Sequence, residues 1–327
     1  VSMILLNALI CGAAIAVSAG MLRRRAFLPA KNVLLNIFRH LDETFTSMNK
    51  VTGGVELIKD RNQWPTKDPI AWRETSRKSL GTFRYLFRVL VVLEVPTLIA
   101  CQSVNIGMQE GATWLNGLLY FLWTIAALMI CSHGASLISG ERSNQTLSVL
   151  LTTPMTGRSI LIQKVSGLRR LVCVLLVPFL TIFAFEAWWN DGYGISYLAG
   201  SILTLSTMLP AIAWTSIWIG LHIRSQTRAI LTSIGTVAVI AVMPVVVREL
   251  VARQLQLRTD GLGDYLLSLS PIDIIRAIET KRPESYGLPE DPAAIYLASF
   301  AVFGGLAMVM RFLALRNIDR KLGRVPE

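Results

Sequence analysis

The sequence predicts an all-α, polytopic helical membrane protein with about seven transmembrane helices, and three observations support this. Charged residues make up 16% of the 327 residues and hydrophobic residues 53%, whereas soluble domains carry about 25% charged residues. Apolar segments of roughly 20 residues, the length that a helix needs to cross the hydrocarbon, recur along the chain. Lys and Arg gather in some of the intervening loops and are missing from others.

The apolar segments divide the chain. Backbone groups have no water to bond in lipid, so each segment is expected to be a helix. The expected spans are 3–22, 85–101, 114–138, 171–189, 195–223, 229–247 and 293–315. We divide the chain into a first span (1–22), a cytoplasmic amphipathic or elbow region (23–82), a membrane domain of six helices (83–316) and a cytoplasmic tail (317–327).

The basic loops predict the orientation. Residues 23–82 hold twelve Lys and Arg, whereas 102–113 and 190–194 hold none, and basic loops favour the cytoplasm. The N-terminus is therefore expected outside and the C-terminus in the cytoplasm. The loop 248–292 must then lie outside although it holds six Lys and Arg; its eight Asp and Glu and its length make that acceptable.

The stretch before the second span opens with Asp68-Pro69. Asp is a favoured helix N-cap and Pro a favoured first helical residue, so a helix is expected to begin here. Glu74 and Lys78 stand four residues apart as a pair that supports a helix. The helix is either a soluble linker or a helix lying on the membrane; Trp72 and the flanking basic residues favour the second.

The short loop 139–164 reads SGERSNQTLSVLLTTPMTGRSILIQK. Leu147, Leu150 and Leu151 occupy positions i, i+3 and i+4, which is one apolar face of a helix too short to cross a membrane. Thr153-Pro154 is expected to end that helix and to begin the next. The apolar face either docks into a soluble partner or rests against the bilayer, and spacing alone does not choose between these.

This loop resembles the signature loop of type-2 ABC exporter permeases. There an acidic–basic pair precedes a Gly-Thr-Leu-Glu-x-Leu-Leu core, then a Pro, a basic residue and a Lys. Gln145 and Ser148 depart from that pattern, standing where Gly and Glu are usual. The matching residues are Glu141, Arg142, Thr146, Leu147, Leu150, Leu151, Pro154, Arg158 and Lys164.

A second stretch, DPIAWRE, is similar to a string that precedes the first core helix in a bacterial subgroup of the same family. Its matching residues are Asp68, Pro69, Trp72, Arg73 and Glu74. The resemblance covers about residues 68–316, with the signature loop between the second and third of six helices. The span 3–22 would then be the last span of a preceding half.

The resemblance implies the permease subunit of an ATP-driven exporter in the bacterial inner membrane. Residues 141–154 would be the coupling helix that contacts a separate ABC ATPase. A second permease half is implied, either in a homodimer or earlier in a longer chain. No G-x-x-x-x-G-K-[ST] string occurs, so no cofactor is expected in this chain, and ATP and Mg²⁺ would sit on the ATPase.

Two polar residues inside expected spans suggest an alternative, a membrane-embedded enzyme. Glu94 precedes Pro96 by two residues, and a carboxylate in lipid is a functional candidate by default. A structural hydrogen bond, either across helices or to backbone freed by Pro96, is the favoured explanation of Glu94, and a satisfied buried side chain is that of His133. A non-transporting scaffold acting through 23–82 is the third hypothesis. Nucleic-acid binding is disfavoured, no metal site is expected, and the transported substrate is not indicated.

Overall fold

The computed structural model describes residues 68–74, 83–106, 111–189, 194–255, 271, 275, 292–316 and 318–323. The chain divides into two compact units, Val1–Trp64 and Pro65–Glu327. All described residues belong to the second unit. The expected span 3–22, most of the elbow region, Lys78 and most of the loop 248–292 lie outside the described residues.

Every described element is a helix, in agreement with the predicted class. The long helices are α4 (Phe83–Asn105), α5 (Gly111–Ser143), α7 (Gly157–Trp189), α8 (Gly194–His222), α9 (Gln226–Leu255) and α12 (Pro292–Leu315). The short helices are α3 (Pro69–Trp72), α6 (Leu147–Leu151) and α13 (Ile318–Leu322).

Five of the described helices are long and apolar enough to cross a membrane, and they correspond to five expected spans. They are Trp114–Ser143, Gly157–Trp189, Tyr197–His222, Gln226–Val247 and Tyr296–Leu315. In α4 the apolar stretch Val89–Asn105 is shorter. Helix α7 begins fourteen residues before the expected span 171–189, because Lys164, Arg169 and Arg170 interrupt the apolar pattern without interrupting the helix.

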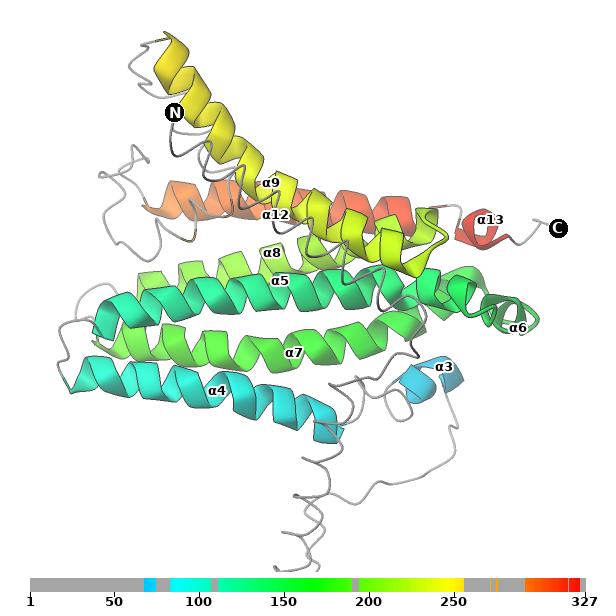
Figure 1. Cartoon of the computed structure of the whole chain (residues 1–327), viewed down its shortest axis with the longest axis horizontal. Helices are drawn as coiled ribbons and strands as arrows, with labels where there is room; N and C mark the ends of the chain where they lie inside the picture. Colours follow the sequence, from blue (N-terminus) through cyan, green and yellow to red (C-terminus); the bar gives the residue numbers. More distant parts are fainter. Residues whose placement is uncertain are drawn as a thin grey trace, which may run out of the picture. The chain divides into compact units, whose positions relative to one another are not determined.

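The long helices form a bundle with α5 and α8 at its centre. Helix α5 contacts α4, α7, α8 and α9, and α8 contacts α7, α9 and α12. In Figure 1, α4, α5, α7, α8 and α12 run alongside one another, whereas α9 crosses them at an angle. The short helices α3, α6 and α13 lie at one end of this bundle. We call this end, with the α8–α9 turn, the polar end.

Small residues bring α5 and α8 into close contact. A Cβ placed on Gly220 would lie 2.3 Å from the Ala135 backbone oxygen, and one on Gly134 would lie 3.0 Å from Ser216 Cβ. Aromatic rings fill the space between α5 and α7, where Trp123 and Phe179 have ring centroids 4.9 Å apart. The outward faces are apolar instead of charged, as expected of helices in lipid. The most exposed large apolar side chains on them include Val92, Leu231, Met308 and Phe312.

Candidate functional site

Positive charge gathers at the polar end of the bundle. The described Lys and Arg there are Arg73, Arg142, Arg158, Lys164, Arg169, Arg170, Arg224, Arg228, Arg316, Arg320 and Lys321. At the opposite end, the described ends of α4, α5, α7, α8 and α12 carry none, and α9 carries Arg248 and Arg253. Both stretches that the sequence singled out, 68–74 and 139–164, meet at the polar end.

Four side chains from these stretches form an ion-pair cluster: Arg73, Glu74, Glu141 and Lys164. Lys164 Nζ donates to Glu74 Oε1 at 3.1 Å and to Glu141 Oε1 at 2.7 Å. Arg73 Nη2 donates to Glu141 Oε1 at 3.0 Å and lies 3.6 Å from Glu74 Oε1. The Lys164 side chain is 0% exposed and that of Glu74 is 1% exposed. Two carboxylates and two cations balance, as buried charges require.

Helix α3 is held against α7 beside this cluster. Gln163 Nε2 donates to Asp68 Oδ1 at 3.0 Å, and Gln163 Oε1 accepts from the Ile70 backbone N–H at 3.1 Å. The expected helix start at Pro69, with Asp68 as its N-cap residue, is confirmed, but the side-chain bond typical of an Asp cap is not formed. Asp68 has a left-handed backbone, with φ 55°, and makes no side-chain cap bond. Its carboxylate is oriented towards Gln163 instead.

The connection from α5 to α6 is tied to Glu141. The Thr146 backbone N–H donates to the Glu141 carbonyl at 3.0 Å, and the Thr146 hydroxyl donates to Glu141 Oε2. Gln145, between them in sequence, has φ 59°. Left-handed backbone of this kind is unstrained only for glycine, which gives a physical reason for the Gly that is usual here.

Arg142 links the end of α5 to two other helices at the same end. Its Nη1 donates to the Leu221 carbonyl at 2.8 Å and its Nη2 to the Lys321 carbonyl at 2.7 Å, so it satisfies the ends of α8 and α13. Asp319 accepts from the Gly157 backbone N–H at 2.8 Å, at the start of α7. Burial lowers the pKa of Lys321, whose ammonium donates to the Leu313 carbonyl.

Two leucines of helix α6 pack against the protein instead of facing solvent or lipid. Leu147 packs into the main core, and Leu150 packs with Ile70 and Ile160. Leu147 and Leu150 therefore face neither of the two expected surroundings, a soluble partner or the bilayer. Val149, on the other side, is 68% exposed. Sequence spacing found the face correctly and could not tell what covers it.

The surroundings of α6 include an open hollow of about 520 Å³. Its lining consists of Arg142, Gln145, Leu147, Ser148 and Arg224. Pro154 is exposed and lies in the connection 152–156. Helix α7 begins only at Gly157, so Pro154 does not occupy its first turn as expected.

The two intramembrane candidates do not form one site. Thr181 on α7 donates to Glu94 Oε1 at 2.7 Å, a bond between helices that agrees with the favoured explanation. His133 lies instead near Gly167, where a Cβ would be 3.8 Å from His133 Nε2 and 3.6 Å from Glu74 Cβ. Gly167 and Thr181 are about 21 Å apart along α7. Among the described residues, no group of His, Cys, Asp and Glu could hold a metal ion.

Some members of the polar end were not singled out from the sequence. Gln163 and Asp319 each bridge to a distant segment, at sequence separations of 95 and 162 residues. Of these two, the sequence offered a signal only for Gln163, which is a polar residue inside the apolar run that begins at Ile160. Asp319 stands among basic residues and resembles an ordinary tail residue.

Comparison with known proteins gives one family. The sequence model of a family described as ABC-2 family transporter protein matches residues 4–321, nearly the whole chain. No curated protein matches the chain.

Proposed function

The chain belongs to the ABC-2 transporter family as a membrane component, and from this we propose that it is the permease subunit of an exporter driven by a separate ATPase that docks at α6. ATP and Mg²⁺ would bind to that ATPase. A second permease half, from another copy or from an earlier part of a longer chain, would complete the pathway.

The observation that carries the proposal is the way α6 is anchored. Helix α6 is a short element at the end of the bundle, and Glu141 beside it shares a buried cation, Lys164, with Glu74. Thr146, which precedes α6, bonds to Glu141 at the end of α5. A displacement of α6 that carries Glu141 with it must therefore move Lys164 and Glu74 as well, or break charge pairs that are costly to break in a buried setting. A short helix that is held in this way suits the transmission of motion from a bound ATPase to the membrane helices.

The surface offered to the ATPase is mixed in character. Val149 supplies an exposed apolar contact, and the hollow beside it is lined by Arg142 and Arg224. We expect the partner to bring an apolar pocket for Val149 and an acidic side chain for the hollow, since burial of an apolar side chain and a charge-assisted hydrogen bond both favour association.

Charge placement supports a cytosolic position for this surface. The polar end carries most of the described Lys and Arg, and basic segments favour the cytoplasmic side. In this orientation the N-terminus lies outside and the C-terminus in the cytoplasm of a bacterial cell, in its inner membrane.

Co-purification with candidate ATPases from neighbouring genes tests the proposal. Val149→Asp should reduce ATPase retention by about tenfold or more, because it places a charge in an apolar contact. Ile106→Asp is the matched control, since Ile106 is 66% exposed at the opposite end. Equal retention by wild type and both variants, or no retained ATPase at all, would contradict docking at α6.

A further inference from the structure

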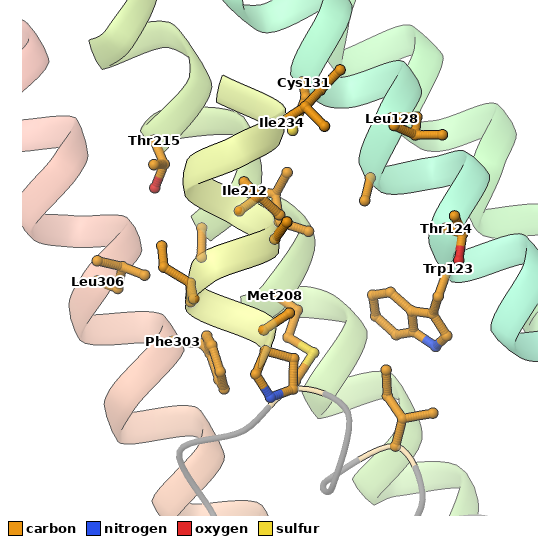
Figure 2. A pocket seen from close by; sticks show the side chains of 18 of the residues that line it. Trp123, Thr124, Leu128, Cys131, Met208, Ile212, Thr215, Ile234, Phe303 and Leu306 are labelled. Carbon is orange, nitrogen blue, oxygen red and sulfur yellow. The ribbon is translucent and has the colours of Figure 1, made fainter. Parts of the chain in front are cut away.

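A cavity of about 390 Å³ opens among α5, α8, α9 and α12 (Figure 2). It lies deep in the membrane part of the bundle, because Met208 on its wall is midway between the ends of α8. The lining of the cavity runs from Tyr120 to Cys131 along α5, a distance of about 16 Å. The cavity is thus elongated along the helix axes.

The lining is almost wholly apolar. Figure 2 shows Trp123, Met208, Ile212, Phe303 and Leu306 around the opening. Helix α9, which forms one wall, is the least buried of the five membrane-crossing helices, with 6% of its apolar window buried. The wall that α9 forms therefore lies between the cavity and the surrounding hydrocarbon.

One polar group in this lining lacks a partner. Thr215 is 2% exposed, and its Oγ1 is buried without a hydrogen bond. Two other hydroxyls on α8 bond within the helix: Thr204 donates to the Gly200 carbonyl at 2.9 Å, and Ser216 to the Ile212 carbonyl at 2.7 Å. Ser201, the other described buried hydroxyl on α8 without a partner, does not line the cavity. Because a buried hydroxyl without a partner is unfavourable, Thr215 favours a ligand that supplies one.

We propose that this cavity binds one long-chain amphiphile, whose hydrocarbon part fills the apolar lining and whose hydroxyl, carboxyl or amide group pairs with Thr215. Resting on the proposed transport function, this assigns the cargo to the lipid-like class. Two features of the structure favour such a molecule over a compact polar one. The cavity is long and apolar, and among the described residues that line it only Thr215 has a buried oxygen without a hydrogen bond.

Binding is tested on the purified full chain with the fluorescent fatty acid cis-parinaric acid. Thr215→Val keeps the shape and removes the hydroxyl, so it should weaken binding by about tenfold. Thr215→Ser should retain binding. Thr204→Val is the matched control, because Thr204 is buried on the same helix but does not line the cavity.

A larger side chain that fills the cavity tests the role of the apolar lining separately. Ala127→Phe should abolish binding, whereas Ala184→Phe, the same change on an exposed position of α7, should not. Size-exclusion elution and thermal unfolding show that each variant is folded. Wild-type affinity in both Thr215→Val and Ala127→Phe would overturn the proposed site.

The cargo assignment is tested with the ATPase bound, in liposomes. Parinaric acid should stimulate ATP hydrolysis by the wild type and leave Ala127→Phe unstimulated. Binding without stimulation would mean that the cavity holds a resident membrane lipid, and would overturn the cargo assignment. Failure of the docking proposal has a different signature, because a chain that retains no ATPase would still bind the probe.

Discussion

Gln145 illustrates how a single departure from a family pattern acquires a physical meaning. Its φ of 59° is one of two positive values among the described non-glycine residues, the other being that of Asp68. The side chain of an L-residue crowds the backbone in this conformation, at a cost of about 1 kcal/mol. Thr146 and Glu141, which bond to each other on either side of it, hold the turn in place.

Gln145→Gly is therefore expected to stabilise the protein by about 1 kcal/mol, since glycine adopts this conformation freely. Thermal unfolding in detergent measures the change. Ser148→Gly, in the first turn of α6, is the control and should destabilise by about 0.5–1 kcal/mol. Destabilisation by both substitutions would show that the turn carries no strain.

Lys164 is the residue on which the ion-pair cluster depends. Lys164→Met would remove the buried cation that Glu74 and Glu141 share, and removing one member of a buried ion pair costs about 3–5 kcal/mol. Arg169→Met removes the same charge from an exposed position of α7, where surface changes stay within about 0.5 kcal/mol. Unfolding transitions of the two variants give the comparison.

A companion variant separates charge from packing. In Lys164→Met with Glu74→Gln, the cluster regains charge balance, so part of the lost stability should return. If the double variant is no more stable than Lys164→Met alone, the cost arises from packing and the cluster is not held by charge.

At the scale of elements, the α5–α8 contact depends on the absence of side chains. Gly220→Ala would place a Cβ 2.3 Å from the Ala135 carbonyl oxygen, a distance that forces the helices apart. We expect a loss of about 1–3 kcal/mol, typical of overpacking. Gly235 on α9 has nothing within 4 Å of its Cβ position, so Gly235→Ala should be neutral or stabilising. Equal effects in thermal unfolding would contradict the close contact.

The helices were largely predictable from the sequence, and their partners were not. Apolar length located the described spans because lipid imposes that length on a helix. It failed at the start of α7, where Arg169 and Arg170 end the apolar pattern while the helix continues. The inward direction of Leu147 and Leu150 was missed for a related reason: periodicity defines a face, and only tertiary packing decides what lies against it.

The partners within the ion-pair cluster were likewise not predictable from the sequence. Family resemblance selected Arg73, Glu74, Glu141 and Lys164 one by one, but it did not predict that they pair. Lys164 and Glu74 are separated by 90 residues, and nothing local in the chain brings them together. The assignment of Glu141 and Lys164 to ATPase docking stays a prediction, and both residues are buried in the described part of the chain.

For the molecule as a whole, the division into a polar end and an apolar body explains how it can sit in a membrane. The ion-pair cluster and the charged residues of α13 lie at one end of the bundle, while large apolar side chains are exposed along the long helices. The side of the membrane on which the polar end lies follows only from the distribution of Lys and Arg, and it decides whether a cytosolic ATPase can reach α6.

Single-cysteine labelling in intact cells tests this orientation. In a background that lacks Cys11, Cys101, Cys131 and Cys173, Thr152→Cys places an exposed thiol at the polar end and Gln102→Cys one at the opposite end. A maleimide that passes the outer membrane but not the inner one should label the thiol at 102 only, and the thiol at 152 should react after inner-membrane permeabilisation. Labelling of 152 in intact cells would place α6 outside, where no ATP-driven motor could act on it.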